Sequence, residues 1–171
     1  TDALVDKTGA TGTISITGRD GVGANDAAVI LNDAIVRSQT TQITITGVNQ
    51  DVVMNQTDAT NGVRSNSGNA LIQSSNDVLL GIVNLDNDAA GAQGTAYITA
   101  DADTNPAFTG GQDSDCVGEI RDNLTLAGLD AVNIVATAAV LRAGDGIGNF
   151  TYDGNIAAED LNNVDQVNLD I

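Results

Sequence analysis

Two segments of the sequence repeat one alternation of apolar and hydroxyl side chains, and this repeat constrains the fold more than any other feature. The segments read T-I-S-I-T-G at Thr13–Gly18 and Q-I-T-I-T-G at Gln42–Gly47, with a glycine at the same place in each. Alternation with a period of two residues is typical of a half-buried β-strand. The repeat therefore predicts two equivalent strands in successive structural units.

Further β-type runs follow along the chain. The clearest unit is Asp130–Asn149, in which the runs Val132–Thr137 and Ala139–Arg142 lead into a glycine-rich corner at Gly144–Gly148. Apolar residues chosen as unit starts are separated by 29, 28, 26, 35, 18 and 17 residues. These starts are Ile14, Ile43, Leu71, Tyr97, Val132, Phe150 and Val167.

Two segments are less decisive. Ala27–Arg37 suits a short helix capped by Asn25 or Asp26, but its β-branched residues suit a strand equally well. Thr57–Gly68 is polar, and we expect a loop there.

The runs predict one all-β domain over residues 1–171, folded as a parallel β-helix (β-solenoid). Residues 1–12 form a lead-in strand or linker, and residues 101–115 form a loop insertion. Coils of a solenoid accept insertions at their corners, and each coil buries its apolar face only by stacking on its neighbours. An antiparallel β-sandwich is the alternative, because strands spaced roughly 8–12 residues apart with glycine turns suit it as well.

Composition limits the core and the partners. Hydrophobic residues make up 42% of the chain but aromatic residues only 2%, so the core must consist of small branched side chains in narrow layers. The formal net charge of −17 repels nucleic acid and anionic membrane surfaces. No run approaches the ~20 apolar residues of a membrane span, so we expect no membrane insertion.

Three phrases are similar to a known family of repeats. They are T-I-S-I-T-G at Thr13–Gly18, N-L-T-L-A-G-L-D at Asn123–Asp130 and D-A-V-N-I-V-A-T-A-A-V-L-R-A-G-D-G-I-G-N at Asp130–Asn149. They resemble the coils of large repetitive bacterial surface proteins of the filamentous-haemagglutinin type. The resemblance implies a long right-handed parallel β-helix in an extracellular or cell-surface protein that is fibrous or adhesive. It also implies that this chain is a segment of a longer stalk or a subunit of a filament.

The residues available for catalysis are few, and we expect no enzyme. The chain has no histidine, which excludes Ser-His-Asp and Cys-His pairs. Carboxylates beside Cys116 raise a thiol's pKa, the wrong direction for a nucleophile. Paired carboxylates could hydrolyse polysaccharides on a β-helix, but sugar sites normally also need the aromatic platforms that this chain largely lacks.

Calcium is the one cofactor that the sequence suggests. Asp101–Gln112 begins with oxygen ligands in the spacing of an EF-hand loop, but it has Pro106 where the loop needs glycine and Gln112 where it needs glutamate. A looser site remains a hypothesis, and plain turns explain the same residues, because Gly, Asp and Asn form turns without a ligand. The candidate calcium ligands are Asp101, Asp103, Asp113 and Asp115.

The sequence thus predicts a structural or adhesive extracellular module that assembles end to end with copies of itself or with neighbouring repeats. Unpaired edges of the first and last coils invite such assembly. The residues predicted to form the assembly interface are Leu4, Val5, Val167, Leu169 and Ile171. The alternative is a calcium-stabilised β-sandwich subunit of a surface layer or filament.

Overall fold

The structure is a computed structural model. All regular secondary-structure elements among the residues that it describes are β-strands. These residues are 3–9, 11–19, 27–86, 94–101, 118–124, 132–144, 146–148 and 169–170. The strands are β1 (Leu4–Lys7), β2 (Ile14–Arg19), β3 (Val29–Asn32), β4 (Ile35–Ser38), β5 (Ile43–Val48), β6 (Val52–Asn55), β7 (Gly62–Ser65), β8 (Ala70–Ser74), β9 (Val78–Leu80), β10 (Val83–Asn84), β11 (Thr95–Thr99), β12 (Glu119–Asp122), β13 (Ile134–Val135), β14 (Ala138–Arg142), β15 (Gly146–Ile147) and β16 (Leu169–Asp170). No helix among these residues is long and apolar enough to cross a membrane.

Every third strand belongs to the same sheet, so one coil consists of three strands. The sheets have the orders β1-β4-β7-β10-β13-β16, β14-β11-β8-β5-β2 and β15-β12-β9-β6-β3. Neighbouring strands pair in parallel throughout. The β-solenoid prediction is confirmed, and the antiparallel sandwich is wrong for the described strands.

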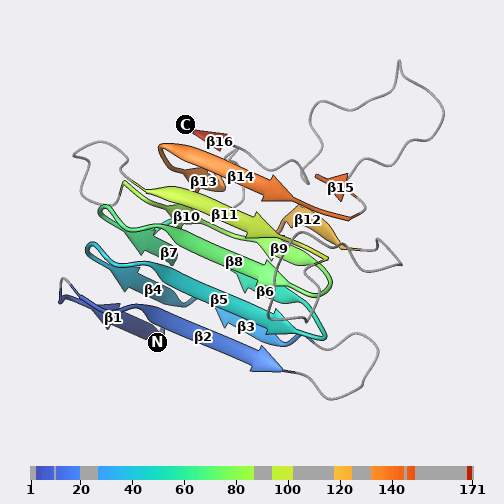
Figure 1. Ribbon diagram of the computed structural model, residues 1–171, viewed down its shortest axis with the longest axis horizontal. Helices are drawn as coiled ribbons and strands as arrows, with labels where there is room; N and C mark the ends of the chain where they lie inside the picture. The colour runs from blue at the N-terminus through green and yellow to red at the C-terminus, as the bar shows by residue number, and fades with distance from the viewer. Residues whose placement is uncertain are drawn as a thin grey trace.

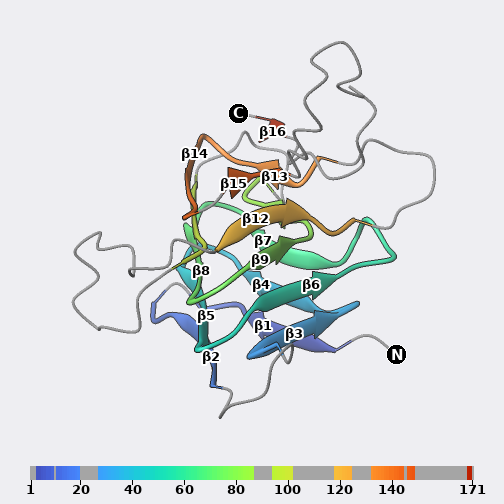
Figure 2. The same cartoon turned by 90° about the vertical axis from the view of Figure 1, so that its right-hand side faces the viewer.

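The coil is right-handed. In Figure 1 the near strands β2, β5, β8, β11 and β14 run from left to right, while the strands behind them run back as the chain climbs from N to C. Figure 2, turned by 90°, separates the three sheets around a common interior. Right-handed crossovers are the rule for parallel strands, because a right-twisted strand packs back onto its sheet only in that sense.

The repeated segments occupy equivalent positions, as the sequence predicted. β2 pairs with β5 so that Ile14 lies beside Ile43, and Gly18 beside Gly47. The predicted alignment is wrong by one residue in the next two coils, where Ala70 and Ala96 continue the column of Ile43. A shift of one residue moves a side chain to the opposite face of a strand. Leu71 and Tyr97 therefore lie on the outer face, and Tyr97 is 41% exposed.

Other predicted unit starts fall elsewhere. Val132 precedes β13, which belongs to a different sheet from Ile14, so the two residues are not equivalent. Phe150 and Val167 lie outside the described residues. The run Ala139–Arg142 is confirmed as part of β14.

Two ambiguous segments form strands. Ala27–Arg37 contains β3 and β4, so the helical reading is wrong. Val29 and Val36 take inward positions in two parallel ladders, which a helix would not provide. Thr57–Gly68 was predicted as a loop but contains β7, whose Gly62–Ser65 pairs with all four residues of β4. The glycine corner Gly144–Gly148 likewise includes the short strand β15.

The core is a set of apolar columns that run along the solenoid axis, and it contains no aromatic side chain among the described residues. One column belongs to the sheet of β2 and comprises Ile16, Ile45, Ile72, Ile98 and Leu141. The middle residues of this column, Ile45, Ile72 and Ile98, are fully buried. Residues of similar shape stack at each level, which confirms the expected narrow layers of small branched side chains.

One corner needs glycine because backbone segments of successive coils approach closely there. A Cβ atom built on Gly68 would lie 2.2 Å from the carbonyl oxygen of Thr41. A Cβ atom built on Gly94 would lie 2.2 Å from the carbonyl oxygen of Gly68. Any side chain at these positions would force two coils apart.

The register makes a testable prediction about two adjacent residues of β8. Replacing buried Ile72 with alanine should lower the free energy of unfolding by roughly 2–5 kcal/mol, because it opens a cavity in a column that cannot collapse. The matched change Leu71→Ala removes a side chain of the same size from the outer face and should cost less than about 1 kcal/mol. Urea denaturation followed by circular dichroism measures both, and equal losses would contradict the register.

Candidate assembly interface

Two of the predicted assembly segments lie at opposite edges of the same sheet. β1, which contains Leu4 and Val5, is the first strand of the six-stranded sheet, and β16, which contains Leu169, is the last. No described strand pairs with the outer side of either strand. Val167 and Ile171 lie outside the described residues, so their part in the interface stays a prediction.

Val5 begins an apolar column that continues through the whole sheet. Its register partners, coil by coil, are Val36, Val63, Val83, Ile134 and Leu169. Val36 is 1% exposed and Val63 is fully buried, whereas Val5 is 43% exposed. This difference in exposure follows from position in the stack. Val5 has a described coil on one side, whereas Val36 has one on each side. Val5 is therefore a core residue of the solenoid without its second neighbour.

Leu4 occupies the other face of the same strand. It pairs with Ile35, which is half-buried, and Leu4 itself is 57% exposed. Ile30 of the edge strand β3 is also exposed, at 52%. The sequence thus identified the correct edge strand, and the structure shows that Val5 and Leu4 have different surroundings.

An ion pair fastens β1 to the next coil. Asp6 and Arg37 are register partners, and the Nη2 atom of Arg37 lies 2.6 Å from Oδ2 of Asp6. Hydrogen bonding from Arg37 lowers the pKa of the Asp6 carboxyl. Both side chains are exposed, so the pair contributes little to stability but orients the end strand.

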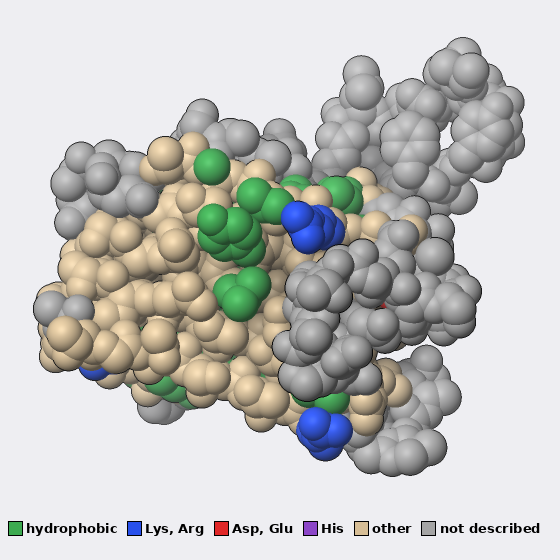
Figure 3. All heavy atoms as spheres, viewed as in Figure 1, with side chains coloured by type: hydrophobic (Ala, Val, Ile, Leu, Met, Phe, Trp, Pro, Cys, Tyr) green, Lys and Arg blue, Asp and Glu red, His purple; other side chains and the backbone are tan. Residues whose placement is uncertain are grey.

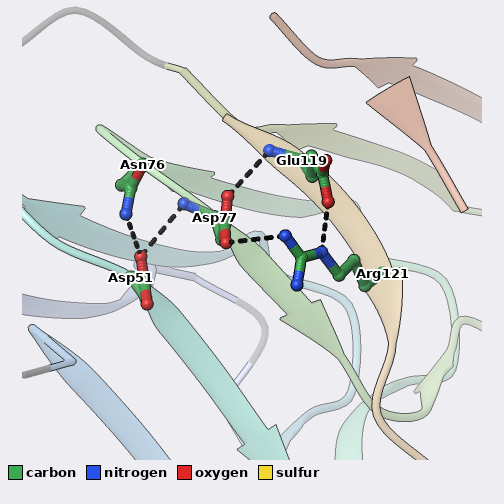
Figure 4. Close-up of polar contacts among 5 residues, drawn as sticks. All are labelled: Asp51, Asn76, Asp77, Glu119 and Arg121. Carbon is green, nitrogen blue, oxygen red and sulfur yellow. Dashed lines mark hydrogen bonds and ion pairs between the residues drawn. The ribbon is translucent and has the colours of Figure 1, made fainter. Parts of the chain in front are cut away.

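A second group of residues, the polar corner, joins three coils where the strands of the third sheet begin (Figure 4). Oδ1 of Asp51 accepts hydrogen bonds from Nδ2 of Asn76 at 2.7 Å and from the backbone N–H of Asp77 at 3.1 Å. Oδ1 of Asp77 in turn accepts the backbone N–H of Glu119 at 2.9 Å. Each carboxylate thus binds a backbone donor of the following coil.

Arg121 closes the polar corner. Its guanidinium donates to Oε2 of Glu119 and lies 3.6 Å from Oδ2 of Asp77. The side chain of Asp77 is only 17% exposed, and burial raises the pKa of its carboxyl despite the opposing effects of the Glu119 N–H and Arg121. These contacts give Asp51, Asp77 and Glu119 a structural role as links between coils.

Asparagines form a parallel link at the other end of the same sheet. Nδ2 of Asn55 donates to Oδ1 of Asn32 at 2.7 Å, and Nδ2 of Asn123 donates to Oδ1 of Asn55 at 2.7 Å. These hydrogen-bonded amides connect successive asparagines of three coils, and they align the ends of β3, β6 and β12.

The polar corner was missed by sequence reasoning, although a signal was present. Asp51 and Asp77 each precede a valine that starts a strand, and those valines, Val52 and Val78, are register partners. Glu119 precedes Ile120, the next residue of that column. A search for acids that recur just before an apolar strand would have found the three carboxylates.

The candidate calcium site lies mostly outside the described residues. Asp101 is placed just after β11; it is 4% exposed, and its φ of 60° lies in the left-handed region. Asp103, Asp113 and Asp115, like Cys116, are not among the described residues. Within the described ranges no three acidic or cysteine side chains gather as a metal site. Calcium binding stays a prediction.

Comparisons with protein-family models, with curated proteins and with solved structures find no match for this chain. The resemblance to filamentous-haemagglutinin-type repeats therefore stays a prediction, and the structure supports only the fold that it implied.

The raised pKa of Asp77 predicts how stability changes with pH. The folded state holds the Asp77 proton more tightly than the unfolded chain, so ionising Asp77 costs stability as pH rises through its raised pKa. Asp77→Asn removes this cost and keeps an oxygen acceptor for the Glu119 N–H. The stability of Asp77→Asn relative to wild type should therefore increase from about pH 3 to pH 7.

Asp33 is the matched control of opposite sign. Hydrogen bonds from the backbone and the hydroxyl of Thr57 lower the pKa of its carboxyl. Asp33 therefore stabilises the fold above its unfolded pKa, and Asp33→Asn should lose stability relative to wild type as pH rises. Urea unfolding of each variant across this pH range measures both trends, and parallel trends for the two variants would contradict the assignment.

Proposed function

We propose that this chain is a structural or adhesive module of an extracellular fibre, whose coils continue end to end into a neighbouring copy or repeat. The observation that carries the proposal is the apolar column from Val5 to Ile134, which reaches the β1 edge of one parallel sheet, while Leu169 of β16 is the register partner of Ile134 at the other edge. A further coil placed on either edge would extend this column without changing its register.

The end coil gains from such a contact. Val5 and Ile30 expose 43% and 52% of their surfaces at the edge of the described chain, whereas equivalent residues inside the stack are buried or half-buried. Burying apolar surface stabilises by roughly 25 cal/mol per Å². Edge strands also present free backbone donors and acceptors to any strand at the ~4.8 Å spacing of a sheet. Hydrophobic burial and backbone pairing therefore favour the same axial contact.

Composition supports an extracellular setting and a mechanical role. A net charge of −17 keeps a long repetitive surface soluble, and a single cysteine leaves the stability to stacking rather than to an internal disulfide. The polar corner and the asparagine links hold successive coils by hydrogen bonds in addition to the core. Load along the fibre would be shared by the backbone pairing of three sheets.

Two substitutions on β1 test the proposal. Val5→Lys places a charge in the apolar column and should abolish lengthening of particles with concentration. Leu4→Lys places the same charge on the outer face of the same strand and should reduce assembly much less. Negative-stain electron microscopy and light scattering across a concentration series measure particle length.

Wild-type particles that stay at the length of one chain at every concentration would overturn self-assembly. Equal assembly by wild type and Val5→Lys would show that the Val5 column does not form the contact. Thermal melting of both variants checks that each has kept its fold.

A further inference from the structure

The outer face of one sheet lacks acidic residues in a strongly acidic protein. The strands β2, β5, β8, β11 and β14 contain no Asp or Glu, and they contain two arginines, Arg19 and Arg142. The chain as a whole has 23 acidic residues against six basic ones. Strands of the other two sheets include Asp6, Glu119, Asp122 and Asp170. We call the outer surface of β2, β5, β8, β11 and β14 the acid-free face.

An apolar row crosses this face. Leu71, Tyr97 and Val140 are successive register partners in β8, β11 and β14. Tyr97 is 41% exposed, Val140 is 36% exposed and Leu71 is half-buried. Figure 3 shows hydrophobic side chains gathered on the near face of the molecule, with a Lys or Arg side chain beside them. Below the row, Thr44 and Ser15 continue the same column.

The distribution of acidic residues determines which surfaces of two copies can come into contact. Two chains that each carry a net charge of −17 repel one another, and a contact between acidic surfaces adds close carboxylate pairs. The acid-free face brings no carboxylate from its strands to the contact. It also carries Tyr97, and tyrosine is typical of the centre of protein interfaces.

We propose that a second copy of this chain docks on the acid-free face, in a twofold arrangement centred on Tyr97. A twofold axis that lies between the two faces, parallel to the strands and over Tyr97, places Val140 of each copy opposite Leu71 of the other. The apolar row is thus complementary to itself, which an isologous interface requires. Two sheets that pack in this way lie about 10 Å apart, with their outer side chains interdigitated.

The contact is small. Three strands spaced about 4.8 Å apart cover the overlap, well below the roughly 800 Å² per partner of a standard interface. One pair of modules therefore forms a weak dimer. The same contact repeated along two fibres would gain strength through multivalency, and it would join fibres side by side.

This inference concerns lateral contact and does not depend on end-to-end assembly. It is tested in the Val5→Lys variant, in which axial assembly is suppressed. Sedimentation equilibrium from micromolar to millimolar protein should show a monomer–dimer equilibrium. Adding Tyr97→Asp should raise the dissociation constant at least tenfold, because it buries a charge at the centre of the contact.

Ser15→Asp is the matched control, since it adds the same charge to the same face. Ser15 lies three strands from Tyr97 in the same column, whereas β14 is the only described strand that follows on the other side of Tyr97. The twofold arrangement therefore places Ser15 beyond the overlap, and its substitution should change the dissociation constant less than threefold. Circular dichroism confirms that both variants are folded.

Salt separates this contact from one made of ion pairs. Raising ionic strength screens the repulsion between two acidic copies and should strengthen the dimer. Dimerisation that weakens in salt would overturn the proposal in favour of Arg142 or Arg19 pairing with acids. A protein that is monomeric at every concentration, assembly beyond two copies, or equal effects of Tyr97→Asp and Ser15→Asp would each overturn it as well.

Discussion

The structure depends on the in-register stacking of like side chains from one coil to the next. A strand of four to six residues buries only two or three side chains, which is too few to hold a coil closed alone. Stacking in one column gives Ile45, Ile72 and Ile98 an apolar neighbour above and below. The period of two residues then fixes every other position, because outward residues follow from inward ones.

Polar contacts secure the corners, where the apolar columns end. Leaving a buried polar group without a hydrogen-bond partner costs free energy. The need for a partner therefore restricts which backbone positions of successive coils can lie above one another. The hydroxyl of Ser74 donates to the carbonyl of Gln50 at 2.7 Å, and the side-chain oxygen of buried Gln56 accepts the N–H of Ile82. Both bonds cross between coils. The polar corner follows the same principle with charged groups, at the cost of partly burying Asp77.

The sequence was sufficient for the fold where adjacent coils share a pattern and insufficient where they differ. Thr13–Gly18 and Gln42–Gly47 repeat closely, and the two strands pair as predicted. β7 was missed because Val63 is its one large apolar residue, although Val63-Arg64-Ser65 repeats Val36-Arg37-Ser38 in register. The predicted alignment made Leu71 and Tyr97 equivalent to Ile43. The inward positions are taken by Ala70 and Ala96, which are fully buried and continue the column of Ile43.

The candidate interface residues could likewise be predicted from the sequence only in part. Leu4 and Val5 lie on β1 and Leu169 lies on β16, the edge strands of the six-stranded sheet, and their role in an interface stays a prediction. That Val5 belongs to the core column and Leu4 does not required the register with Val36 and Ile35. The acid-free face could not be found by reading along the chain, because Tyr97 and Val140 are brought together only by pairing across a long intervening segment.

The distribution of charge gives the three surfaces of the solenoid different roles. The edge strands β1 and β16 have backbone groups with which a neighbouring strand along the axis would pair. The polar corner uses its carboxylates internally, which leaves them less available to partners. The acid-free face is where lateral approach meets no acidic side chain from the strands. The proposed axial growth and the proposed lateral contact therefore use different residues, so a substitution such as Val5→Lys should remove the first and leave the second intact.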